Sequence, residues 1–358
     1  MTSPAAGYVP LGSELPASVR RLASFRPGAP VLSLYLDLDP TEFPTPRART
    51  SAITSLLDAA HRQIEDYETD HARKESLRSD LAHAREFFEQ WSPNGTRGVA
   101  VFSATMAGFF ETVPLPRPTP TWASIDNSPY VTPLVTAADT HDWLIAVVDA
   151  HEARMLHGNT GHIEELERIV DSVAGQQEAS GPTDHQRWVE HQVDRHLAHA
   201  AREAEAQLGA GNYQHIIVGG PREIAPRFES RLSASARERL AGRFAVELAG
   251  RTPDDIREAA LPCFEAEERR YERATLDRLA ERLGRATRAV AGPEDVYDVL
   301  AQRRVETLLF EERIEFAAPR AIEWMIEEAI AQSAEILPVR YEPDELALRG
   351  HVAALLRF

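Results

Sequence analysis

A two-faced pattern in residues 187–208 constrains the fold more than any other stretch of this sequence. The run reads RWVEHQVDRHLAHAAREAEAQL, and its apolar residues recur every three or four positions. At about 100° per residue they fall within an arc of about 100°, and they are Val189, Val193, Leu197, Ala200, Ala204 and Leu208. The pattern predicts a helix about 30 Å long, at 1.5 Å per residue, that packs one face against a core.

The opposite face of this helix carries a row of basic residues within an arc of about 120°. We name it the basic row, and its members are Arg187, His191, Arg195, His199 and Arg202. One interpretation is a solvated face whose charges pair with Glu190, Asp194 and Glu205 at helical spacing. The other is a surface that follows RNA phosphates and positions the loop before the helix.

Histidines near the same helix raise the question of a metal site. They are His185, His191, His196 and His199. Only His196 and His199 have i,i+3 spacing, and no glutamate lies between them as in a metalloprotease helix. We therefore expect no metal. The sequence also lacks a Gly-x-Ser-x-Gly nucleophile motif and a P-loop, because the Gly219–Gly220 pair is not followed by Gly-Lys-Ser/Thr. We expect no bound cofactor.

Charge and cysteine content narrow the function classes further. The net charge of −17 argues against indiscriminate coating of nucleic acid, although it allows a local basic patch. Cys263 is the only cysteine, so neither an intrachain disulfide nor a cysteine-based zinc site can form, and we expect a buried, inert thiol. The start of the chain has no signal-peptide pattern and no run approaches about 18 apolar residues, so we expect a cytoplasmic protein without a membrane span.

At 358 residues the chain is long enough for two or three domains. The first part predicts a strand, two long helices and two further strands, at 31–39, 47–91, 97–104 and 108–115. The Pro-rich segment 114–133 is either a domain boundary or an extended crossing strand.

The middle of the chain predicts strands at 143–150, 152–158 and 213–220, and a loop over 161–185. We expect the glycine pair that ends the third strand to let the backbone pass close to a helix. Helices are predicted at 229–250 and 252–288, the second as a connection between domains. The last 70 or so residues alternate helix, strand, helix, strand and strand, which predicts a compact α/β unit.

Five motifs together resemble one family. They are WLIAVVDAHEARMLHGNTGHIEEL, RWVEHQVDRHLAHAAREAE, YQHIIVGGPREIAPRFESRL, AVAGPEDVYDVLAQRRVETLLFEE and the closing GHVAALLRF. In order and content they resemble the bacterial branch of the archaeal and eukaryotic class-1 release factor and Pelota superfamily. The resemblance implies an α/β, three-domain release-factor-like architecture, each domain a mixed sheet with packed helices. The implied domains are 1–130, 131–275 with the tip loop and basic-faced helix, and 276–358, of the type that docks RNA or a partner.

The resemblance also locates a catalytic tip that this chain has altered. Gly181, Pro182 and Thr183 stand where the family has Gly-Gly-Gln, whose glutamine lies beside the ester bond of peptidyl-tRNA. Proline fixes φ and has no N–H, and a threonine hydroxyl is shorter than a glutamine amide. Gln176 or Gln177 would substitute only if the loop folds differently.

Three functions follow as hypotheses from the resemblance. The first is a non-catalytic ribosome binder at the A site, in contact with rRNA alone or with rRNA and tRNA, in hibernation or rescue of stalled ribosomes. The second is a peptidyl-tRNA hydrolase, and the third is a protein–protein adaptor with the same fold. The resemblance of residues 276–358 implies a docking face for a translational GTPase. The family's Asn-Ile-Lys-Ser codon-reading element has no counterpart, so codon-specific termination is not expected.

Overall fold

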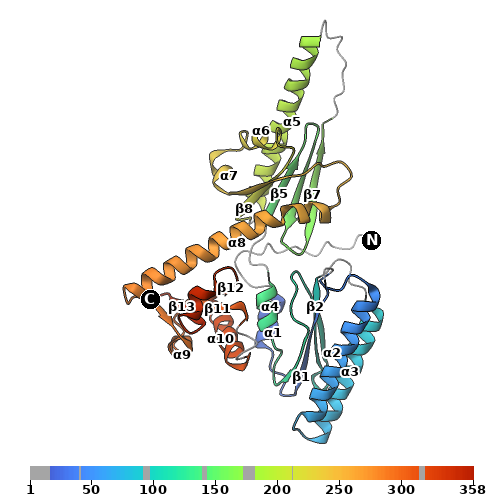
Figure 1. Ribbon diagram of the computed structural model, residues 1–358, viewed down its shortest axis with the longest axis vertical. Helices are drawn as coiled ribbons and strands as arrows, with labels where there is room; N and C mark the ends of the chain where they lie inside the picture. The colour runs from blue at the N-terminus through green and yellow to red at the C-terminus, as the bar shows by residue number, and fades with distance from the viewer. Residues whose placement is uncertain are drawn as a thin grey trace. The chain divides into compact units, whose positions relative to one another are not determined.

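The computed structural model contains three β-sheets with helices packed on them (Figure 1). It describes residues 17–39, 42–91, 97–138, 143–171, 182–211, 213–313 and 319–358. The chain forms two compact units, one from Asp139 to Arg270 and one that joins Glu14–Ala138 to Tyr271–Phe358. Each sheet lies within one of the three predicted domains, while the domain limits themselves stay a prediction. The mixed α/β fold class is confirmed.

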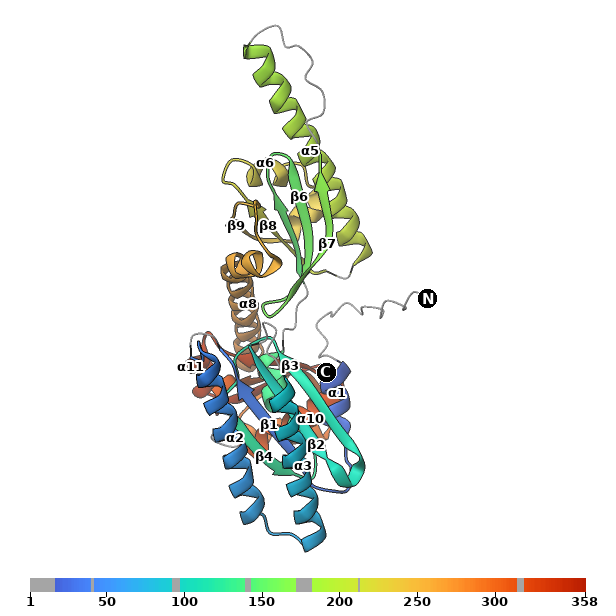
Figure 2. The same ribbon diagram turned by 90° about the vertical axis from the view of Figure 1, so that its right-hand side faces the viewer.

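The first sheet is antiparallel throughout, with strand order β3-β2-β1-β4. Its elements are β1 (Val31–Asp37), α2 (Pro46–Asp66), α3 (His71–Gln90), β2 (Gly98–Ala104), β3 (Phe109–Leu115) and β4 (Trp122–Asp126). The two predicted helices begin at side-chain caps, because Thr45 accepts from the N–H of Ala48 and Asp70 from that of Arg73. They lie together on one face of the sheet (Figure 2). The Pro-rich segment proves to be a crossing strand, since it contains β4.

The last sheet has strand order β10-β13-β11-β12, in which only β11 and β12 are parallel. Its elements are β10 (Ala289–Ala291), α9 (Pro293–Ala301), β11 (Val305–Glu311), α10 (Pro319–Ala331), β12 (Glu335–Val339), α11 (Pro343–Ala347) and β13 (Val352–Leu356). The predicted succession of helix, strand, helix, strand and strand is confirmed. The structure adds the short elements β10 and α11.

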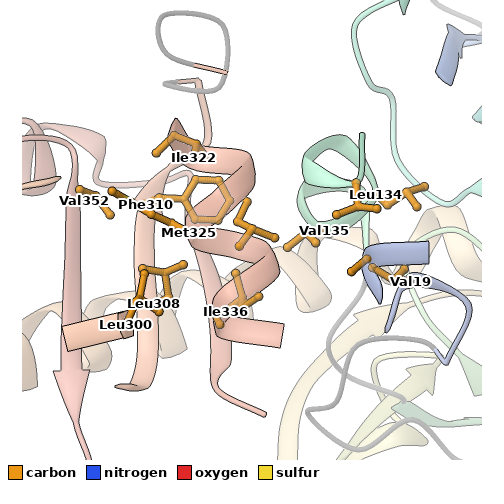
Figure 3. Close-up of a cluster of buried hydrophobic side chains, with 14 of the residues drawn as sticks. Val19, Leu134, Val135, Leu300, Leu308, Phe310, Ile322, Met325, Ile336 and Val352 are labelled. Atoms are coloured by element: carbon orange, nitrogen blue, oxygen red, sulfur yellow. The ribbon is translucent and has the colours of Figure 1, made fainter. Parts of the chain in front are cut away.

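Two short helices join the first and last sheets into one core. They are α1 (Ala17–Ser24) and α4 (Thr132–Ala137), and both contact α10. Val19, Leu134 and Val135 meet Met325 in a buried cluster (Figure 3). The carboxylate of Glu323 in α10 accepts the N–H groups of Val131 and Thr132, at 2.6 and 3.0 Å. It thereby satisfies donors that the start of α4 would leave unpaired.

The middle sheet has strand order β7-β6-β5-β8-β9 and is covered on both faces. Its elements are β5 (Trp143–Val148), β6 (Glu152–Gly158), β7 (Ile163–Val170), α5 (Pro182–Ala210), β8 (His215–Gly220), α6 (Ala225–Glu229), α7 (Ala234–Glu238), β9 (Leu240–Ala245) and α8 (Pro253–Gly284). The central strand β5 is fully buried. Its alternate residues face α5 (Leu144, Ala146, Val148) and α8 (Trp143, Ile145, Val147).

The connecting helix is confirmed as α8, which is 32 residues long and contains Pro262. The boundary between the two units falls inside it, after Arg270. Ile256 and Phe264 in its first half pack under the middle sheet, and Leu276 and Leu279 in its second half pack under the last sheet. Cys263 lies in the same helix as a buried free thiol, as expected.

Two predictions of local structure were wrong. The segment 161–185, expected to be a loop, contains β7. This is an edge strand in which only Ile163 and Ile169 are buried, so most of its residues are polar and its sequence resembles that of a loop. The helix expected over 229–250 is instead α6, α7 and the strand β9. Strand β9 has one buried residue, Phe244. Strand β9 pairs with β8, which lies far from it in the sequence. The charged local sequence does not predict this strand, because its formation depends on that tertiary contact.

The glycine pair that ends β8 faces strands rather than a helix, which corrects our expectation. A Cβ on Gly219 would lie 2.5 Å from the ring of Phe244, and one on Gly220 would lie 2.3 Å from the carbonyl oxygen of Val148. Gly220 also has φ of +152°. Both positions therefore need glycine for close approach of neighbouring strands.

None of the helices in the described ranges is long and apolar enough to cross a membrane.

Candidate nucleic-acid interface

The helix α5 is held to the middle sheet by the apolar stripe that the sequence predicts. Val193, Leu197, Ala200, Ala204 and Leu208 are buried, and Val189 near the start is only partly buried. No side chain from 187 to 192 is buried, and Figures 1 and 2 show the first turns of α5 continuing past the ends of the strands. The helix therefore carries its N-terminal end away from its own sheet.

Four members of the basic row are exposed on α5. Arg187, His191, Arg195 and Arg202 all lie on the solvent side. Within the described part of the chain, none of the four forms an ion pair or a side-chain hydrogen bond with another residue. The positive charge of the three arginines is thus available to an external anion.

Two acidic residues of α5, Asp194 and Glu205, bind groups outside the helix. This bears on the alternative interpretation, in which the charges of the basic row pair within the helix. Asp194 lies 2.9 Å from Arg227 and 3.1 Å from Arg231, measured between carboxylate oxygens and guanidinium nitrogens. The hydrogen bond from Arg227 holds the pKa of Asp194 below its usual range. Glu205 accepts the backbone N–H of Ser233 at 2.5 Å. Neither carboxylate neutralises an arginine of the basic row, and Arg227 with Arg231 leaves one surplus positive charge beside Asp194.

His199, the fifth member of the row, is partly engaged by its own chain. Its Nδ1 lies 3.2 Å from Oδ2 of Asp171, and its side chain remains 45% exposed. His196, whose side chain is 1% exposed, places Nδ1 2.8 Å from the same oxygen. Burial opposes the charge on Asp171, but the two histidines outweigh it and lower the pKa of that carboxyl. Asp171 directly follows the last residue of β7. Its contacts with the two histidines therefore hold the end of β7 against α5.

Removing this contact is expected to destabilise the middle unit. In an Asp171→Ala variant the buried imidazole of His196 loses its partner on Nδ1, while Nε2 is already buried without a described partner. We expect the free energy of unfolding to fall by about 1–3 kcal/mol, measured by urea denaturation. His199→Ala is the control and is expected to change it by less than about 0.5 kcal/mol, because that side chain is half exposed. Equal effects of the two substitutions would contradict the anchoring role.

The tip candidates are only partly covered by the structure. Pro182 is the first residue of α5 and Thr183 follows it in the first turn. Proline suits this position because its missing N–H would have no helical partner there. Gly181, Gln176 and Gln177 lie outside the described residues, and the roles proposed for all five stay predictions.

The described histidines of α5 do not form a metal centre. His196 and His199 both contact one oxygen of Asp171, and no group of three ligand side chains in the described ranges is arranged to hold a metal ion.

Residues 129–265 match the model of a protein family, the bacterial archaeo-eukaryotic release factor family 10. The matched segment contains the middle sheet, α5 and the first part of α8. The match confirms, over these residues, the release-factor resemblance that the motifs of the middle segment predict. No curated protein matches the chain.

Solved structures with a similar fold include an archaeal translation termination factor aRF1. It is 20% identical, with 96% of this chain and 94% of that chain covered and a TM-score of 0.28. Ribosome-bound archaeal Pelota, solved with ABCE1, is 19% identical over 70% of this chain and 72% of that chain, with a TM-score of 0.45. Dom34 of S. cerevisiae, which interacts with Hbs1, is 12% identical over 73% and 79%, with a TM-score of 0.42.

Proposed function

We propose that this chain is a ribosome-binding translation factor that acts without catalysing peptide release. One observation carries the proposal: α5, the long helix of a release-factor-like unit, extends past its sheet with exposed arginines that form no ion pair with any carboxylate among the described residues. The release-factor family match over residues 129–265 supports translation as the setting.

The spacing of the basic row suits an RNA backbone. Arg187, His191 and Arg195 follow one another at four-residue intervals, about 6 Å along the helix axis. Guanidinium groups bind phosphate through two parallel hydrogen bonds, and structured RNA is recognised mainly by shape and backbone contacts. We infer that α5 lies along ribosomal RNA in the A site and brings its N-terminal end toward the peptidyl-transfer region.

The altered tip supports a role without catalysis. The resemblance places Gly181, Pro182 and Thr183 at the family's Gly-Gly-Gln. A proline at the second position gives no N–H, and a threonine does not reach as far as a glutamine. A factor of this kind occupies the site and keeps other factors out, as in hibernation or in the recognition of stalled ribosomes.

Co-sedimentation with 70S ribosomes over a salt series, together with a peptide-release assay, tests the proposal. We expect binding whose affinity falls steeply with salt, and no hydrolysis of peptidyl-tRNA above the rate in buffer. Release activity that Thr183→Ala or Gln176→Ala abolishes would instead identify a hydrolase. If the protein does not pellet with ribosomes at any salt concentration, the ribosome-binding proposal is rejected. The hypothesis of a protein–protein adaptor is then favoured.

A translational GTPase is the partner that we propose for residues 276–358. The proposal rests on the resemblance of the motifs in that segment. We propose a cytoplasmic location for the same chain, since a ribosome-binding factor acts where the ribosomes are.

A further inference from the structure

A second group of arginines gathers at one edge of the last sheet. Arg288 directly precedes β10, Arg304 directly precedes β11, and Arg357 directly follows β13. Because β13 runs antiparallel to both neighbours, its end lies beside their starts. Two backbone bonds fix this arrangement, from the N–H of Leu356 to the carbonyl of Arg288 at 2.9 Å and from that of Arg357 to the carbonyl of Arg304 at 3.0 Å. Three adjacent strands place the three residues within about 10 Å of one another.

The turn that ends α9 adds a fourth arginine. The N–H of Arg303 bonds to the carbonyl of Leu300 and that of Arg304 to the carbonyl of Val299, at 2.9 and 3.1 Å. This pair of bonds defines a Schellman turn, and Arg303 takes its left-handed position with φ of +55°. Arg303 is exposed, as are Arg288 and Arg357. We name Arg288, Arg303, Arg304 and Arg357 the arginine edge.

Three members of the arginine edge keep their positive charge. The guanidinium groups of Arg288, Arg303 and Arg357 have no ion pair with a carboxylate in the described part of the chain. Arg304 is already engaged, because it donates to Oε1 of Gln302 and to a backbone oxygen of Phe358, the last residue of the sequence, both at 3.1 Å. Arg357 donates to the carbonyls of Gln332 and Ser333, at 2.7 and 3.0 Å, and those acceptors carry no formal charge.

Two glutamates close to the edge are already paired with other arginines. Glu281 pairs with Arg285 at 2.9 Å, and Glu306 pairs with Arg282 at 3.0 Å. The three arginines without an ion pair, Arg288, Arg303 and Arg357, form a positive local field in a chain of net charge −17.

We propose that the arginine edge binds the phosphate backbone of RNA. The planar fork of arginine matches phosphate oxygens. The exposed ring of Phe358, whose centroid lies 6.0 Å from Cζ of Arg304, adds a surface on which a base can stack. The choice of RNA over an acidic protein rests on the ribosomal function proposed above. The edge lies on a different unit from α5, so the two surfaces are tested separately.

Fluorescence anisotropy with a labelled 20-base-pair RNA duplex tests this surface in the full chain. The starting protein carries Arg187→Glu, Arg195→Glu and Arg202→Glu, so that α5 no longer contributes. Adding Arg288→Glu and Arg303→Glu is expected to weaken RNA binding about tenfold or more and to reduce the salt slope by about 2. The matched control adds Arg62→Glu and Arg85→Glu, two exposed arginines of α2 and α3, and is expected to stay within about twofold of the starting protein.

The outcomes separate this proposal from the ribosomal one. If the test pair and the control pair of substitutions weaken RNA binding equally, the effect comes from the change in net charge alone. That result would overturn the proposal. Absence of RNA binding by the protein with the intact edge would also overturn it, whatever α5 does on ribosomes. Displacement of the RNA by polyglutamate at lower concentration than by unlabelled RNA would assign the edge to an acidic protein instead. Edge-dependent RNA binding by a chain that fails to pellet with ribosomes would support the edge and reject the ribosomal function.

Discussion

Reversing Arg187, Arg195 and Arg202 to glutamate is expected to weaken binding to 70S ribosomes about 100-fold, measured by co-sedimentation at 100 mM salt. Each reversal removes a phosphate contact and places a negative charge beside the RNA backbone. The slope of log affinity against log salt is expected to fall by about 3. The fold should survive, because all three side chains are exposed and unpaired within the described part of the chain.

The matched control separates the position of the charges from their number. Arg47, Arg62 and Arg85 are exposed on α2 and α3, and reversing them changes the net charge from −17 to −23, as the α5 variant does. We expect the control to bind within about threefold of the wild type, since screening limits long-range repulsion at this salt. Comparable losses in both variants would mean that α5 has no special place in the complex.

The shape of α5 could be predicted from the sequence because a helix repeats every 3.6 residues. That period alone separates Leu197 and Ala204 from Arg195 and Arg202, and the structure buries the first pair and exposes the second. The exposure of His199 was harder to predict, because its partner Asp171 lies 28 positions earlier in the chain. Such a contact depends on where β7 ends, and the polar sequence of β7 does not show that it is a strand.

The sequence alone did not decide whether nearby carboxylates neutralise the basic row. Asp194 lies three residues after His191, a spacing that favours contact within the helix. The fold instead brings Arg227 of α6 to its carboxylate, and Arg231 joins from the next turn of chain. The packing of α6 on α5 determines which arginines pair with Asp194. No local sequence pattern predicts this packing. The same holds for the arginine edge, which only the strand order of the last sheet assembles.

One buried carboxylate determines how the last sheet is attached to α8. Glu272 is 2% exposed, and its two oxygens accept the backbone N–H groups of Arg340, Tyr341 and Glu342 at 2.8, 2.9 and 2.8 Å. These residues form the turn between β12 and α11. Burial raises the pKa of Glu272 even though the three N–H groups favour its charged form. The sequence shows this residue only as one more glutamate in a highly charged helix.

Replacing Glu272 by alanine is expected to lower the free energy of unfolding of its unit by about 3 kcal/mol, because the N–H groups of three half-buried residues lose their acceptor at once. Thermal unfolding measures the loss. Hydrogen exchange of Arg340, Tyr341 and Glu342 localises it, since their amides should lose protection before the rest of the sheet. Glu265→Ala, an exposed glutamate on the same helix, is the control and should stay within about 0.5 kcal/mol. If the amides stay protected in the Glu272 variant, the turn is held by its own packing and the carboxylate is dispensable.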